Sequence, residues 1–112
     1  MNILTSYIWG QPPQEMAGYV SAKSALWGLT KALAVDLAPD GITANAISPS
    51  PIMTDQWAGL SDRQRRAMGM RSPLKRLGMA EDVAQAVLYC VGEGGRFLTG
   101  VNLPVAGGEV MQ

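Results

Sequence analysis

Tyr19 and Lys23 are the residues whose types and spacing could do chemistry. They lie four positions apart in a segment with a helical pattern, so their side chains project from one face about one turn apart. A free phenol has a pKa of about 10, and a neighbouring ammonium favours the phenolate. Such a pair could exchange protons near neutral pH. A tyrosine and a lysine at this spacing also occur in many helices as ordinary surface or boundary residues.

Ser6 is a third polar group near this pair. It follows an apolar opening that we interpret as the end of a buried strand, and Gly10 and Pro12 then mark a loop. By itself, a serine after a strand usually only caps or turns the chain. The sequence contains no histidine, which excludes histidine-based triads and histidine-ligated zinc sites. Acid-base chemistry would therefore need tyrosine, lysine or carboxylates.

Helices and strands that would position these groups alternate along the chain. The patterns predict a helix from about Tyr19 to Leu37, a strand from Thr43 to Ile47, a helix capped by Ser61 that runs to about Met68, a helix from Ala80 to Val91, and a strand from Val101 to Val105. Pro49 and Pro51 should break regular structure, because neither can donate to a ladder.

The alternation predicts an α/β fold with a parallel sheet. A sheet of only three strands suggests that a piece of the domain is missing, because a parallel sheet is normally covered on both faces and its edges are protected. In the helix from Ala80 to Val91, an apolar stripe is expected at Val83, Val87 and Val91, and Cys90 lies in an apolar run typical of a core.

Length and charge limit the class of protein. The 112 residues allow one domain, and nine basic residues balance nine acidic ones. Nothing in this balance calls for a nucleic-acid partner. No apolar run is long enough to predict a membrane span, so we expect a cytoplasmic protein without membrane association.

Several motifs in register resemble those of the short-chain dehydrogenase/reductase family. Tyr19-Val20-Ser21-Ala22-Lys23 matches its Tyr-x-x-x-Lys signature, and Ser6 stands thirteen positions upstream, at the family's usual spacing. Further matches follow in order at Asn45-Ala46-Ile47, Pro51-Ile52-Met53-Thr54, Pro73-Leu74-Lys75-Arg76-Leu77-Gly78, Leu98-Thr99-Gly100 and Gly107-Gly108. The chain as a whole, 1–112, resembles the C-terminal catalytic half of such a domain, of the 3-oxoacyl-carrier-protein reductase type.

This resemblance implies half of a Rossmann-like, doubly wound sheet that lacks the N-terminal nucleotide-binding βαβ units. It implies hydride transfer between NAD or NADP and a small carbonyl or alcohol substrate, and the half that would show the cofactor preference is absent. Tyr19 would exchange the proton, Lys23 would assist it and bind the ribose, and Ser6 would hold the substrate oxygen. Pro49, Ile52 and Thr54 would line the cofactor.

The resemblance also separates this chain from the related enoyl reductases, whose tyrosine and lysine lie about seven positions apart. Two positions depart from the family pattern: Ser50 replaces a common glycine, and Ala106 replaces a common aspartate. The segment 53–72 corresponds to the substrate loop, where Trp57, Met68 and Met70 would either contact an apolar substrate or fill the core under a short helix.

Two interpretations of the whole chain remain open at this stage. The first is the catalytic half of a dehydrogenase, acting as a homo-oligomer or with a complementing half. The second is a non-enzymatic scaffold or regulatory subunit that associates with complete family members. Small residues from Ser21 to Ala32 would let another helix approach closely, and Trp27 would be either a contact there or a core residue.

Overall fold

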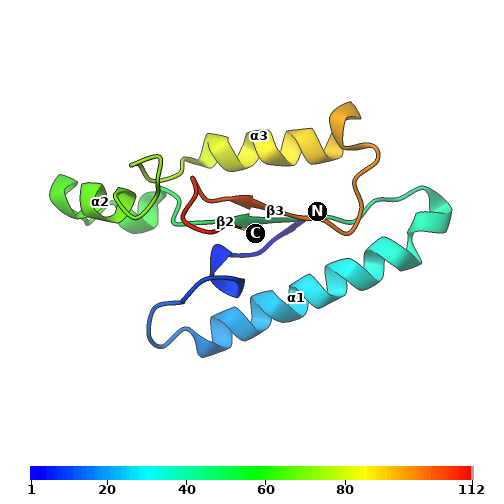
Figure 1. The fold of residues 1–112 in the computed structure, drawn as a ribbon, viewed down its shortest axis with the longest axis horizontal. Helices are drawn as coiled ribbons and strands as arrows, with labels where there is room; N and C mark the ends of the chain where they lie inside the picture. The colour runs from blue at the N-terminus through cyan, green and yellow to red at the C-terminus, as the bar shows by residue number, and fades with distance from the viewer. Residues whose placement is uncertain (112) are drawn as a thin grey trace.

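A parallel sheet of three strands separates two long helices in the computed structural model, which describes residues 1–111 (Figure 1). The strands are β1 (Asn2–Ile3), β2 (Ala46–Pro49) and β3 (Asn102–Val105), and β2 lies in the middle. Ala46 pairs with Asn2 on one side and with Asn102 on the other, both in parallel. The α/β class and the parallel sheet expected from the sequence are confirmed.

One long helix covers each face of this sheet. Helix α1 (Ala17–Asp36) packs below it and α3 (Ala80–Val91) above it in Figure 1, while the short α2 (Asp62–Gly69) lies at one end. Helix α1 begins two residues before the predicted start and ends where Pro39 and the left-handed Gly41, at φ 72°, turn the chain. The bounds predicted for α3 are confirmed.

Buried polar side chains hold the centre of the sheet together. Asn45 donates from Nδ2 to the Leu98 carbonyl at 2.7 Å and accepts from the Val101 amide at 3.1 Å. The Ser48 hydroxyl donates to Asn102 Oδ1 at 2.9 Å. Ala46, Ile47 and Ser48 are fully enclosed, at 0% exposure. The core is therefore narrow and centred on β2, and its polar groups are largely paired within the sheet.

The predicted end of the central strand was wrong, because β2 includes Pro49. The amides of Ala46 and Ser50 donate to the Val101 and Val105 carbonyls of β3, so every second nitrogen faces that strand. Pro49 lies one position out of step with these residues, so its nitrogen faces the β1 side instead. At that level the strand β1 has already ended. A proline there removes no ladder bond, and the strand continues through it.

The apolar stripe of α3 also differs from the prediction. Val83 and Val87 are partly buried, but Val91 is 63% exposed and Cys90 is buried at 3% exposure. Contact with the sheet thus follows a spacing of 3.6 residues per turn rather than a strict four. Burial raises the pKa of the Cys90 thiol, which agrees with the core position predicted for it.

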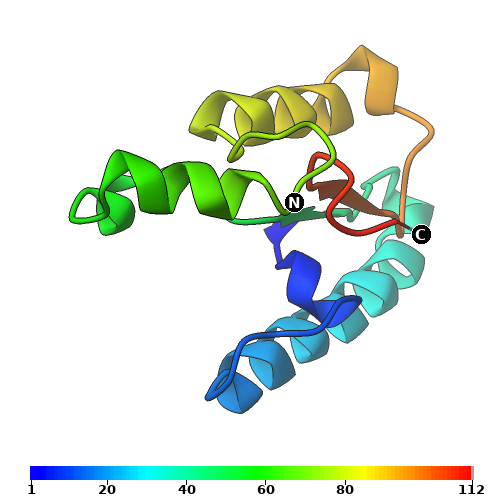
Figure 2. The same cartoon turned by 60° about the vertical axis from the view of Figure 1, so that its left-hand side comes forward.

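Residues 51–78 form a projecting loop that we call the arm. It leaves the sheet after β2, carries the 3₁₀ turn Asp55–Trp57 and helix α2, and closes on itself where Ile52 pairs with Gly78 (Figure 2). The predicted Ser61 cap is confirmed as a capping box with Gln64. The radius of gyration is 15.1 Å, above the roughly 13 Å of a compact domain this long. The fold is therefore open and elongated.

The outer face of α1 carries the small residues that the sequence singled out. Ser21, Ala22 and Ala25 are exposed, and nothing lies within 4 Å of a Cβ placed on Gly28. Trp27 is half-buried, with the Lys31 ammonium 5.4 Å from its ring centre. Among the described residues, no helix is long and apolar enough to cross a membrane.

Candidate active site

Tyr19 and Lys23 lie side by side on the first turns of α1. The Lys23 ammonium donates to the carbonyl of Ile3 in β1 at 2.8 Å and lies 5.7 Å from the centre of the Tyr19 ring. The Tyr19 side chain is 46% exposed, so a ligand can reach its hydroxyl. One bond to the end of β1 thus fixes a cation beside an accessible phenol, which is the arrangement that proton exchange needs.

Both residues line a cavity of about 540 Å³ at the carboxyl end of the sheet. Its walls come from the end of β1, the start of α1, the end of β2 and the base of the arm. The lining residues are Ile3, Leu4, Thr5, Tyr7, Glu15, Met16, Tyr19, Lys23, Pro49, Ser50, Pro51, Ile52, Thr54 and Trp57. Parallel strands place their ligand sites beyond their carboxyl ends, and this cavity occupies that position.

The residues predicted to bind the cofactor all reach this cavity. Pro49 and Ile52 present apolar surface, and Thr54 is exposed at the base of the arm. Ile52 pairs with Gly78, and a side chain at Gly78 would require the end of the Ile52 side chain to move. Ser50, one of the two departures from the family pattern, also lines the wall.

Ser6 lies beside the cavity rather than in its lining. It is buried at 1% exposure in the 3₁₀ turn Ser6–Ile8, and its carbonyl accepts from the amides of Trp9 and Gly10. Its neighbours Thr5 and Tyr7 do line the cavity. The structure therefore brings Tyr19, Lys23 and the expected cofactor residues together and sets Ser6 directly behind that wall.

Tyr7 and Glu15 are lining residues that the sequence interpretation missed. Burial raises the pKa of the Tyr7 hydroxyl; the charge of Arg71 opposes this shift, and Glu109 and Tyr19 add to it. Tyr7 is thus close enough to Tyr19 and to the Arg71–Glu109 ion pair, whose N–O distance is 3.0 Å, to be affected by their charges. The position of Tyr7 next to Ser6 could have identified it as a site residue, whereas no sequence pattern singled out Glu15.

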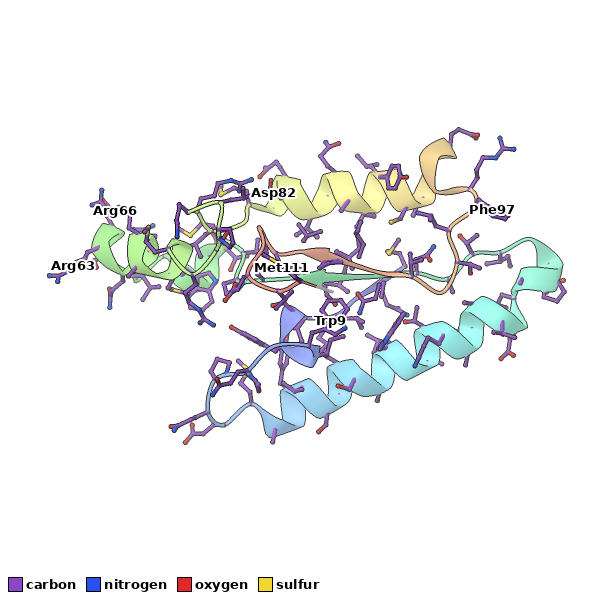
Figure 3. All side chains as sticks on the ribbon, in the orientation of Figure 1. Trp9, Arg63, Arg66, Asp82, Phe97 and Met111 are labelled. Atoms are coloured by element: carbon purple, nitrogen blue, oxygen red, sulfur yellow. The ribbon has the colours of Figure 1, made fainter. Side chains whose placement is uncertain are left out.

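The predicted substrate loop contributes less to the cavity than its composition suggested. Of residues 53–72, Thr54 and Trp57 line the cavity. Met68 is partly buried, and Met70 is 57% exposed. Neither methionine is a core residue under α2, and neither lies in the cavity wall. Arg63 and Arg66 extend from the outer end of α2 (Figure 3).

Known proteins resemble the chain over nearly its whole length. The family model described as enoyl-(acyl carrier protein) reductase matches residues 2–109. The 3-oxoacyl-[acyl-carrier-protein] reductase FabG of Rickettsia felis is 39% identical over 104 residues, which are 93% of this chain and 42% of that protein. Its counterpart in Pseudomonas aeruginosa is 41% identical over 93 residues, 83% of this chain and 38% of that protein.

A solved structure of ElxO with NADP bound is similar in fold as well as in sequence. It superposes with a TM-score of 0.88 at 32% identity, covering 99% of this chain and 46% of that one. The chain spans less than half of the length of each of these relatives.

Proposed function

This chain belongs to the short-chain dehydrogenase/reductase family, and from that premise we propose that it is the catalytic half of an NAD(P)-dependent oxidoreductase that interconverts a carbonyl and an alcohol. The observation that carries the proposal is the Tyr19–Lys23 pair in the cavity wall. The FabG relatives, named for reduction of a 3-oxoacyl group, support carbonyl chemistry. The spacing of four between Tyr19 and Lys23 supports the same choice over double-bond reduction.

The residues present fit the nicotinamide end of the cofactor. Lys23 has three ammonium donors and uses one on Ile3, so two remain for ribose hydroxyls. Pro49 and Ile52 offer an apolar surface for a flat ring, and the exposed Thr54 hydroxyl can bind a polar edge. When bound, the nicotinamide supplies or accepts the hydride.

Proton transfer is the step that this chain's own residues would perform. In reduction, the Tyr19 hydroxyl donates its proton to the substrate oxygen, and in oxidation the phenolate takes it back. The fixed Lys23 ammonium stabilises the negative charge that develops on Tyr19. The role of holding the substrate oxygen, expected for Ser6, stays a prediction, because Ser6 is 1% exposed and lies outside the cavity lining, between Thr5 and Tyr7.

A cofactor titration combined with a reduction assay tests this proposal. The purified chain would be titrated calorimetrically with NADH and NADPH and then assayed for carbonyl reduction. We expect Tyr19→Phe to lower kcat by roughly a hundredfold or more, because the proton donor is lost. Tyr89→Phe, on the outer face of α3 at 55% exposure, is the matched control and should leave the rate unchanged. Full turnover by Tyr19→Phe contradicts the assigned role, and no binding of either cofactor rules out an autonomous enzyme.

A non-enzymatic scaffold is the second candidate, and exposed apolar side chains favour it. Leu88, Val91 and Phe97 are 59%, 63% and 97% exposed on α3 and the segment after it, and Phe97 projects outward in Figure 3. Together with the open small-residue face of α1, they offer two surfaces for another subunit. Light scattering after gel filtration would test self-association, and a strictly monomeric chain would count against it.

A further inference from the structure

Glu15 has a strained backbone conformation at the wall of the cavity. Its φ is 64°, and within residues 1–111 only Lys75, at 57°, is another non-glycine residue with positive φ. This region disfavours residues that carry a Cβ, and a glycine there would relieve the strain. Strained residues persist mostly at ligand sites and switches. The position of Glu15 therefore calls for a functional explanation.

Glu15 also has the right surroundings to contact a ligand. It lies four residues before Tyr19, next to the α1 N-cap Met16, and is the one acidic residue among those that line the cavity. Among the side chains that the structure describes, which exclude those of residues 56 and 112, no ion pair or hydrogen bond engages the exposed Glu15. The only lining cation, Lys23, is bonded to Ile3. A charged group on a bound substrate would thus meet Glu15 without displacing a protein partner.

The cavity that Glu15 lines also has apolar and aromatic walls. Met16, Tyr7 and Trp57 line the same cavity from three separate segments, the start of α1, the turn after β1 and the base of the arm. Aromatic and thioether surfaces suit a ring-bearing ligand. An open carboxylate beside such walls attracts a cation and repels an anion.

We propose that Glu15 is a specificity-determining residue that selects a ring-bearing carbonyl substrate carrying a protonated amine. The inference rests on the proposed function, because it concerns the substrate of the same site. The ring contacts Tyr7 and Trp57, the ammonium pairs with the Glu15 carboxylate, and the carbonyl lies toward Tyr19. If Glu15 had a purely structural role, its negative charge would instead stabilise the N-terminus of α1.

Three matched probes distinguish these roles. Acetophenone, para-(aminomethyl)acetophenone and para-acetylbenzoate share a ring and a carbonyl and differ in charge. Their binding to the full 112-residue chain would be measured by ligand-detected NMR titration. We expect the ammonium probe to bind about threefold to fivefold more tightly than the neutral one, and the carboxylate more weakly, as an exposed ion pair allows. High salt should reduce the difference.

Substitutions then assign the preference to Glu15. Glu15→Gln should abolish the charge preference. Glu15→Gly and Lys75→Gly should both raise Tm, because each relieves a positive φ, but only the first should change ligand preference. Tyr19→Phe should stop turnover and keep the preference, so failure of the proposed reaction is distinguishable from failure of this inference. A preference that survives Glu15→Gln, or no binding of any probe, overturns the proposal.

Discussion

Two parts of the cavity wall, the end of β2 and the base of the arm, are held by different kinds of interaction. The part formed by Pro49 ends a strand in which Ala46, Ile47 and Ser48 are fully enclosed, and Ala46 and Ile47 pair with both neighbouring strands. The arm, which follows β2 along the chain, is tied to the rest of the fold by a hydrogen bond from the buried Ser72 hydroxyl to the Gly107 carbonyl and by two ion pairs with partly buried carboxylates. Arg76 binds Asp82 at 2.6 Å and Arg71 binds Glu109 at 3.0 Å, and both arginine side chains are more than half exposed.

This difference separates a rigid part of the site from an adaptable part. Buried hydrogen bonds cannot exchange with water and strongly resist breaking, whereas exposed ion pairs contribute little. Lys23 is fixed to β1, next to the rigid strand β2, while Thr54 and Trp57 belong to the arm. The chemical pair thus lies on the rigid part, and part of the substrate wall lies on the adaptable part.

The largest expected effect comes from truncating the enclosed centre of β2. Ile47 is 0% exposed, so Ile47→Ala leaves a cavity in the sheet and should lower the free energy of unfolding by about 2–4 kcal/mol. Urea denaturation measures this change. Ile42→Ala removes the same atoms from a residue that is 50% exposed and should cost about 0.5 kcal/mol or less. Equal losses of unfolding free energy for Ile47→Ala and Ile42→Ala would contradict the distinction between the enclosed strand and the exposed surface.

A smaller effect should follow from removing a polar bridge at the amino end of β2, away from the cavity lining. Asn45→Ala deletes the bonds to the Leu98 carbonyl and the Val101 amide and leaves both part-buried groups without this partner. We expect the free energy of unfolding to fall by about 2 kcal/mol, because unpaired buried groups keep their desolvation cost. Gln85→Ala, at an exposed position on α3, serves as the control in the same denaturation series. If the Asn45→Ala variant unfolds at the same urea concentration as the wild type, water replaces the two hydrogen bonds of Asn45.

The smallest effect on stability at neutral pH is expected for the ion pair between the arm and α3. Its contribution should show as a change of Tm with pH. The hydrogen bond from Arg76, with one from the Met79 amide, lowers the pKa of Asp82 from 3.8 to about 2. A carboxylate with a depressed folded-state pKa stabilises the fold above its ordinary value, and this contribution is lost as pH falls toward 2. Asp82→Asn should remove that acid-dependent fall in Tm.

Thermal unfolding between about pH 2 and pH 6 measures the Asp82 contribution. Asp40→Asn, an exposed position without an ion pair in the described residues, should keep the wild-type profile. If Asp82→Asn also keeps that profile, the Arg76–Asp82 pair does not hold the arm.

Much of the fold could be predicted because its signals are local. The Ser61 cap and the bounds of α3 depend on neighbouring residues and could be predicted from the local pattern, whereas the second half of the capping box, from Gln64, was not predicted. The positions of Tyr19 and Lys23 on one helical face follow from a spacing of four. These features hold wherever the segment lies, because a helix repeats every 3.6 residues regardless of its surroundings.

Other features depend on contacts between residues far apart in the sequence, and only the tertiary structure decided them. Pro49 belongs to β2 because its nitrogen faces the side where β1 has ended, which no local pattern reveals. Lys23 is fixed by Ile3, twenty positions away, and Glu15 reaches the cavity only because a left-handed turn precedes α1. The sequence by itself determined which chemical groups the helix presents, and the packing of distant segments decided what surrounds them.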